Sequence, residues 1–163
     1  MKSFYNRRSQ TYNMKFSKKL IIPALVLISI GVLIAAAPWT FAPVCEVPTD
    51  EHPDGLWVTT MGGKQLPMPC GYSARAEIGV GAGVAAIGAM FLFATSIGAI
   101  AALGAVSAVM GASAIALPTA LTGTCAMSSH TCNTLMLPTI ALLGIALIAS
   151  AVGIVLYRKK LSE

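Results

Sequence analysis

Four cysteines are the residues of this sequence with the greatest capacity for chemistry. Cys45 and Cys70 bracket one polar stretch, and Cys125 and Cys132 bracket a shorter one within the segment GTCAMSSHTCNT. Thiols form disulfides, exchange electrons with other thiols, or bind soft metal ions as thiolates. The pairs are separated by 24 and 6 residues, whereas redox pairs and zinc fingers use about two to four. The spacing therefore points away from both of those motifs.

Structural disulfides are the leading interpretation of the cysteines, because both stretches are expected outside the cytoplasm, where disulfides persist. Four cysteines allow three pairings. The economical one joins Cys45 to Cys70 and Cys125 to Cys132, closing each stretch on itself. Each bridge would stabilise the fold by about 3 kcal/mol in the chain-entropy account. Catalytic thiol exchange remains open as a second interpretation.

Metal binding is a third interpretation, because soft ligands accompany the cysteines. Met68 precedes Cys70, and Met127 and His130 lie between the other two cysteines. Thiolate, thioether and imidazole groups together suit Cu(I) or zinc. Such a site requires the two stretches to meet in space and the cysteines to be reduced. The sequence thus requires no cofactor, with copper or zinc as the alternative.

Hydropathy supplies the elements that must position these residues. Of the 163 residues, 56% are hydrophobic and only 10% are charged, against roughly 25% charged in a soluble domain. The apolar runs predict an all-α, polytopic protein with four transmembrane helices arranged as two hairpins. We expect helices over residues 20–37, 76–95, 98–121 and 137–157. Loops over 38–73 and 122–134 then lie on one side, each bracketed by cysteines.

Basic residues predict the orientation of this transmembrane domain, residues 20–157. Nine of the eleven Lys and Arg residues lie in segment 1–19 or in tail 158–163. The positive-inside rule places both termini in the cytoplasm, so the net charge of +5 indicates topology and predicts no nucleic-acid partner. Two alternatives stay open: the first helix is a cleaved secretory signal, or Met14 is the true start.

Small residues recur on the middle helices at spacings that bring helix backbones close together in a membrane. Gly79 and Gly83 lie four apart, as do Gly104 and Ala108. We expect these residues to pack the bundle internally, with a docking face for a partner helix as the alternative. No acidic or basic residue lies within a predicted helix between residues 78 and 157, which argues against a proton-coupled transporter.

Two longer stretches, MPCGYSARAEIGVGAG and CAMSSHTCNTLMLPTIALLG, resemble a bacterial and archaeal family of small four-helix membrane proteins, a domain of unknown function. The shared markers are Pro69-Cys70, the run from Ala76 to Gly79, and the His130-x-Cys132 segment. Where the family pattern has a His-aromatic pair after Pro-Cys, this chain has Gly71-Tyr72. The resemblance implies a prokaryotic cell membrane and no assigned activity.

The sequence contains no catalytic constellation, which favours a non-enzymatic protein embedded in a lipid bilayer. We expect a structural or accessory subunit that assembles with another integral membrane protein, for example a transporter, or with its own copies. The alternative is an outward-facing thiol-redox or copper- or zinc-binding membrane protein.

Overall fold

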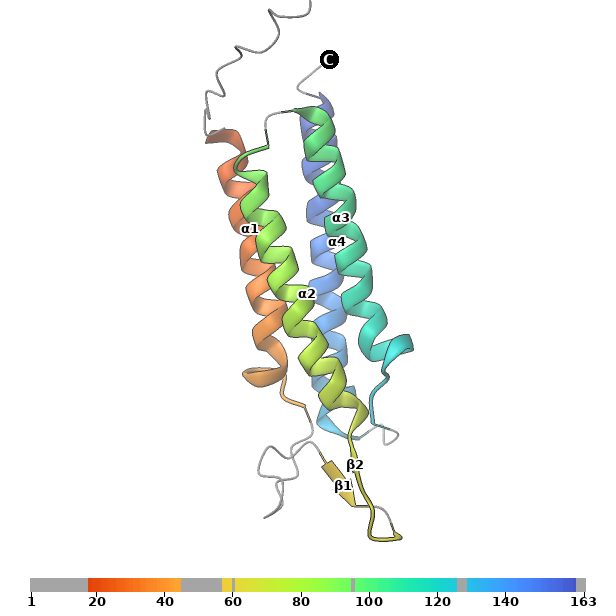
Figure 1. Ribbon diagram of the computed structural model, residues 1–163. Coiled ribbons are helices and arrows are strands. Elements are labelled where there is room, and N and C mark those ends of the chain that lie inside the picture. The colour runs from red at the N-terminus through yellow and green to blue at the C-terminus, as the bar shows by residue number, and fades with distance from the viewer. Residues whose placement is uncertain (1–17, 45–56, 60, 95, 126–128, 161–163) are drawn as a thin grey trace, which may run out of the picture.

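The computed structural model describes residues 18–44, 57–59, 61–94, 96–125 and 129–160. Four long helices form a bundle (Figure 1): α1 (Lys18–Ala36), α2 (Pro69–Phe91), α3 (Ile97–Ala116) and α4 (Leu137–Lys160). A 3-10 turn, Ala37–Trp39, follows α1, and π-helical segments η2 (Leu117–Leu121) and η3 (Cys132–Met136) end α3 and precede α4. All four helices are long and apolar enough to cross a membrane, which confirms the predicted fold class.

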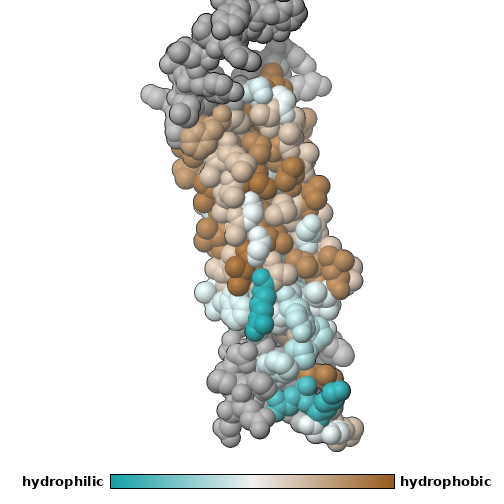
Figure 2. All heavy atoms as spheres, in the orientation of Figure 1, coloured by the Kyte–Doolittle hydropathy of each residue, from teal (hydrophilic) through white to brown (hydrophobic). Residues whose placement is uncertain are grey.

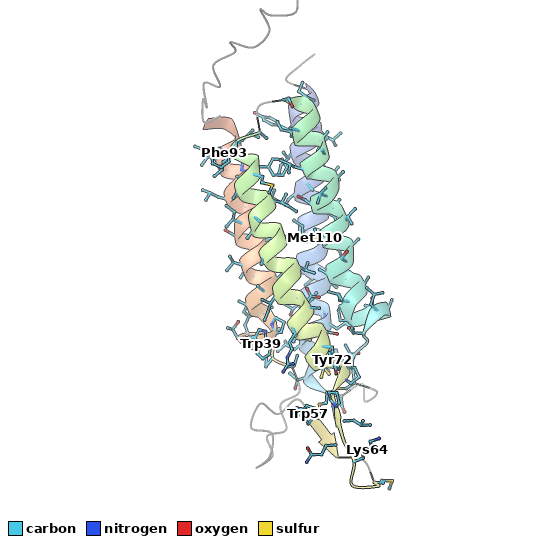
Figure 3. All side chains as sticks on the ribbon, in the orientation of Figure 1. Trp39, Trp57, Lys64, Tyr72, Phe93 and Met110 are labelled. Atoms are coloured by element: carbon cyan, nitrogen blue, oxygen red, sulfur yellow. The ribbon has the colours of Figure 1, made fainter. Side chains whose placement is uncertain are left out.

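The surface of the bundle matches a membrane protein. Figure 2 shows a broad apolar belt along the helices and a polar end beyond it, where strands β1 (Trp57–Thr59) and β2 (Gln65–Pro67) lie. Aromatic side chains mark the borders of the belt: Trp39 and Tyr72 lie toward the polar end and Phe93 at the opposite end (Figure 3). Such interfacial rings anchor a bundle in a bilayer.

Each helix buries residues at alternating steps of four and three, the spacing of a left-handed coiled coil. On α2 the buried seam is Cys70, Ala74, Glu77, Gly81, Val84, Gly88 and Phe91; on α3 it is Ile100, Gly104, Ser107, Gly111 and Ala114. From Ile140 onward, α4 follows the same rule, but the steps from Cys132 through Met136 to Ile140 are four and four. The π-helical η3 accommodates the added residue.

Glycines hold each hairpin together at close range. A Cβ on Gly81 would lie 2.4 Å from the carbonyl oxygen of Gly31, and a Cβ on Gly144 would lie 2.8 Å from that of Gly111. The α1–α2 and α3–α4 pairs are therefore built on backbone contacts that only glycine permits, in agreement with the predicted two hairpins.

The packing residues predicted from the sequence are only partly the ones used. Gly104 packs against Val155 of α4, and Gly83 faces the end of the Met110 side chain. Ala108 is half-buried. Gly79, however, is exposed, and a Cβ there would meet nothing within 4 Å among the described residues. Gly79 lies on the exposed face of α2, two residues before Gly81, which is on the buried seam.

Helix α2 begins at Pro69, seven residues before the predicted start at Ala76. Proline is favoured in the first turn because its missing N–H has no helical partner there, and Met68 caps the helix with an extended backbone. The short antiparallel hairpin β1–β2, not expected in an all-α chain, runs directly into this start and turns at Gly63, which has a φ of 75°. The predicted loop is thus partly ordered structure that positions Cys70 inside a helix.

The first residue of α1 and the last residue of α4 lie at the same end of the bundle, opposite the β-hairpin (Figure 1). We call the end that carries the β-hairpin and the described cysteines the cysteine end. The segments 1–17 and 161–163, with the central part of the first loop, lie outside the described residues.

Candidate functional site

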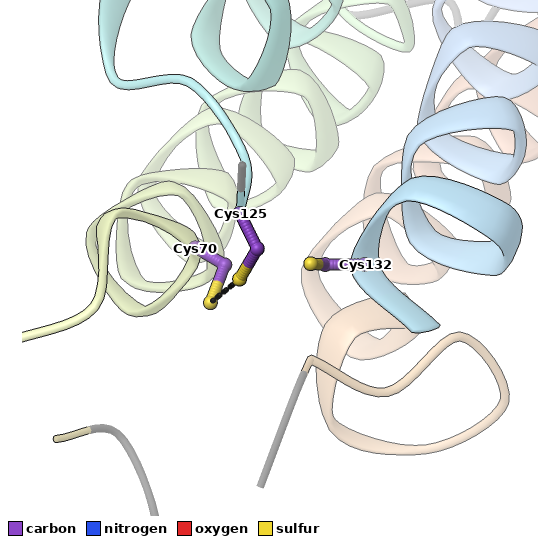
Figure 4. Close-up of side chains that lie close together, drawn as sticks. All are labelled: Cys70, Cys125 and Cys132. Carbon is purple, nitrogen blue, oxygen red and sulfur yellow. Dashed lines mark hydrogen bonds between the residues drawn. The ribbon is translucent and has the colours of Figure 1, made fainter. Parts of the chain in front are cut away.

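Three cysteines from three separate elements meet at the cysteine end (Figure 4). Cys70 is the second residue of α2, Cys125 lies in the segment after η2, and Cys132 begins η3. Their Sγ atoms all lie within 4.8 Å of one another, and those of Cys70 and Cys125 are 3.6 Å apart. Cys70 and Cys132 are fully buried, and Cys125 is half-buried. We call these three residues the thiol cluster.

Two of the cysteines are placed by the helical seams. Cys70 is the first residue of the buried seam of α2, and Cys132 is the first residue of the buried series that leads into α4. Both side chains therefore point into the bundle for the same reason that the apolar side chains below them do. Met136, one turn after Cys132, is also fully buried.

Hydrogen bonds to α2 fix one side of the segment that carries Cys125. The hydroxyl of Ser73, one turn after Cys70, bonds the hydroxyl of Thr122 and donates to the carbonyl oxygen of Gly123 at 3.1 Å. Gly123 has a φ of 76°, a conformation that side chains other than glycine rarely adopt. This turn brings the chain from α3 back over the end of α2.

Asn133 fixes the other side of the same segment. Its amide donates to the carbonyl oxygen of Cys125 at 2.8 Å, and its own carbonyl oxygen accepts a hydrogen bond from the hydroxyl of Thr124. Asn133 follows Cys132 directly, so one residue of η3 holds the backbone of the opposing segment in place. Cys125 is thus held between α2 and η3 from both sides.

The separations differ from those of the predicted disulfides. The 3.6 Å between the Sγ atoms of Cys70 and Cys125 exceeds the about 2.05 Å of a disulfide bond. Cys70 meets Cys125 across the two loops, whereas the economical pairing joined cysteines within each loop. Cys45, the predicted partner of Cys70, lies outside the described residues. Disulfide bonding therefore stays a prediction.

The 3.6 Å separation of the Cys70 and Cys125 sulfurs suits a thiolate metal site. Sulfurs bound to one ion at about 2.3 Å lie about 3.8 Å apart in tetrahedral geometry. The thiols also bear on one another's ionisation. Burial raises the pKa of the Cys125 thiol above its ordinary value, and hydrogen bonds with Cys132 and Cys70 raise it further. A metal ion reverses this preference because it binds the thiolate and displaces the proton.

The other predicted ligands are distributed unequally. Met68 is 8% exposed and packs in the same buried group as Cys70 and Cys132. The Nδ1 atom of His130 is buried without a hydrogen-bond partner in the described part of the chain, but His130 is not among the residues whose ligand atoms gather at the thiol cluster. Met127 lies outside the described residues. Met136 also belongs to this buried group. Its position four residues after Cys132 is the sequence feature from which its location could have been predicted.

Glu77 is the functional candidate that sequence reasoning missed. It occupies the buried seam of α2, seven residues and about two helical turns beyond Cys70, and its side chain is fully buried. Neither carboxylate oxygen has a hydrogen-bond partner among the described residues. Ionisable groups inside a membrane bundle are costly and usually functional. Its neighbour Arg75 is exposed, so the two residues face different environments.

Comparison with known proteins gives one match. A family model described as "Domain of unknown function (DUF4418)" matches residues 27–157, well over half of the chain. This confirms the resemblance to a family of unknown function. No curated protein and no solved structure matches the chain.

Proposed function

We propose that this chain, which belongs to the DUF4418 family, is a multi-pass membrane protein that binds a soft metal ion through Cys70, Cys125 and Cys132. The observation that carries the proposal is the convergence of three thiols from three elements to within 4.8 Å. Three thiolates form most of the coordination shell that zinc or Cu(I) takes in proteins. Binding would release the thiol protons to the aqueous side of the cysteine end.

The hydrogen bonds of the cluster support a binding role over a packing role. Buried cysteines in a core need no polar restraint, whereas a metal site gains affinity when its ligands are held in place before binding. Ser73 and Asn133 hold the backbone on both sides of Cys125. Thr122 and Thr124 complete these contacts.

Metal content tests the proposal directly. The protein would be purified in mild detergent under reducing conditions, and bound copper and zinc would be measured by mass spectrometry. We expect bound metal in the wild type and in Thr119→Ala, an exposed helical control. Cys70→Ser and Cys132→Ser should lose it. Equal metal content in all four proteins would overturn the proposal.

Thiol redox exchange is a second candidate, favoured by the proximity of Cys70 and Cys125. Oxidation of these two thiols to a disulfide would release two protons and two electrons to an external acceptor such as an oxidised thiol–disulfide protein. Mass mapping of the protein without reduction distinguishes the candidates. A Cys70–Cys125 bond that forms and reopens with the redox buffer supports exchange, whereas thiols that stay reduced while metal binds support the metal site.

Assembly with another membrane protein or with a second copy is a further candidate, as a structural or accessory role. Gly79 supports it, because this small residue lies on the exposed face of α2, where a partner helix can approach closely. Cross-linking in membranes before and after Gly79→Leu tests this role. A cross-linked complex that disappears in the variant supports assembly. A chain that remains monomeric in both proteins contradicts it.

For the location, we propose the plasma membrane of a prokaryote with the cysteine end outward. Lys18 and Lys19 begin α1, and Arg158, Lys159 and Lys160 end α4, all at the opposite end of the bundle. Basic residues of this kind stay in the cytoplasm. A membrane-impermeant maleimide should label Met61→Cys, at a fully exposed position of the β-hairpin turn, more strongly than the wild type in intact cells. Labelling that requires broken cells would reverse the orientation.

A further inference from the structure

A small cavity lies where the β-hairpin runs into the start of α2. Its volume is about 60 Å³, and Trp57, Met68, Gly71, Tyr72 and Arg75 line it together with Pro67. Figure 3 labels Trp57 and Tyr72 near the junction of the β-hairpin and α2. Met68 and Gly71 flank Pro69-Cys70 in the chain, so the cavity lies directly beside the start of α2.

Met68 belongs both to the lining of this cavity and to the buried group that contains two of the thiols. Its side chain lines the cavity but is only 8% exposed, because the rest of it packs in the buried group that contains Cys70 and Cys132. Met136 belongs to the same buried group and is fully buried. Two methionines thus belong to the buried group that contains Cys70 and Cys132, and Met68 is the one that also lines the cavity.

The donors gathered here distinguish between the two soft metals. Zinc prefers four ligands that include thiolate, imidazole or carboxylate, whereas thioether sulfur is a ligand for Cu(I). No imidazole or carboxylate of the described residues joins the three thiols within the 4.8 Å group. The other soft donors in the buried group of Cys70 and Cys132 are the thioethers of Met68 and Met136.

We propose that the metal of the thiol cluster is Cu(I) and that the Met68 thioether is the ligand that captures it from the cavity and selects it over zinc. This inference rests on the proposed metal-binding function and names its ion. Met68 binds Cu(I) without losing a proton. In the bound state copper keeps its bond to Met68 and forms bonds to two or three thiolates, each of whose thiols releases one proton to water, with no change in the oxidation state of copper.

The test compares affinities for two metals in matched variants of the full chain in detergent. Cu(I) would be measured against a chromogenic copper(I) chelator under reducing, oxygen-free conditions, and Zn²⁺ against a chromogenic zinc chelator. Met68→Leu conserves volume, so the fold should persist. Met61→Leu is the control, because Met61 is fully exposed on the turn of the β-hairpin. Cys70→Ser tests the cluster itself.

We expect Met68→Leu to weaken Cu(I) binding by about tenfold, the scale of a supporting ligand, and to leave zinc binding unchanged. Met61→Leu should change neither. If Cys70→Ser abolishes Cu(I) binding while Met68→Leu has no effect, the role of Met68 is overturned and the metal site stands. Wild-type binding of Zn²⁺ as tight as that of Cu(I) overturns the selection. If Cys70→Ser retains wild-type metal affinity, the proposed function itself fails.

Discussion

Asn133 should control how well the thiol cluster is organised. Replacement by alanine removes the hydrogen bond to the Cys125 carbonyl, 2.8 Å long, and the one accepted from Thr124. Each contributes about 1 kcal/mol net, so about 2 kcal/mol of restraint on Cys125 is lost. At 1.4 kcal/mol per tenfold change, the dissociation constant for bound metal should rise by about 30-fold. Thr124→Val removes only one bond and should raise it by about fivefold.

The assay is Cu(I) competition with a chromogenic chelator on purified protein, with thermal unfolding of the same samples. Thr134→Ala is the matched control, because its hydroxyl bonds the His130 carbonyl at 3.3 Å and does not reach Cys125. The dissociation constants should rank Asn133→Ala above Thr124→Val above Thr134→Ala. An equal loss in Asn133→Ala and Thr134→Ala would refute the reasoning, because the effect would then reflect general loosening of η3.

The remaining predictions concern packing, burial and pH. Gly81→Ala should lower the free energy of unfolding by about 1–3 kcal/mol, because its Cβ would lie 2.4 Å from the Gly31 carbonyl oxygen. Gly79→Ala should raise the free energy of unfolding by up to about 1 kcal/mol through helix propensity. Equal shifts of the two variants in thermal unfolding in detergent would contradict this difference. Glu77→Gln should change the free energy of unfolding by less than about 1 kcal/mol, whereas Glu77→Lys should lower it by about 3 kcal/mol, because the position is fully buried. Wild-type stability of Glu77→Lys in the same unfolding assay would contradict this burial. Because the pKa of the Cys125 thiol is raised in the folded protein, the metal-free protein should be most stable below about pH 8.5 and lose stability as the pH rises above it. Cys125→Ser should remove this part of the pH dependence in unfolding titrations, and an unchanged slope would exclude Cys125 as its source.

The number of helices follows from local properties of the sequence. An apolar run of about 20 residues crosses a bilayer whatever its neighbours are, so the four spans could be predicted without knowledge of their packing. Because the cysteines lie close to the apolar runs in the sequence, their location near helix ends could also be predicted. The start of α2 was harder, because polar residues such as Ser73 and Arg75 interrupt the apolar run although they lie inside the helix.

The inward faces could not be predicted in the same way. In a soluble helix, polar residues mark the outer face, but in a membrane bundle both faces are apolar and this contrast is lost. Gly79 and Gly81 are therefore equivalent by composition, although only Gly81 packs against α1. The burial of Glu77 could not be predicted for the same reason: its location on the buried seam depends on how α2 is rotated about its axis.

The sequence by itself determined that four apolar helices carry cysteines where the chain enters and leaves them, because hydropathy and length are properties of single segments. Only the tertiary structure decided that Cys70, Cys125 and Cys132 form one cluster across both loops. That choice depends on the rotation of α2 and η3 about their axes and on the hydrogen bonds of Ser73 and Asn133. These contacts join segments that are far apart in the sequence, so the spacing of residues within one segment does not predict them.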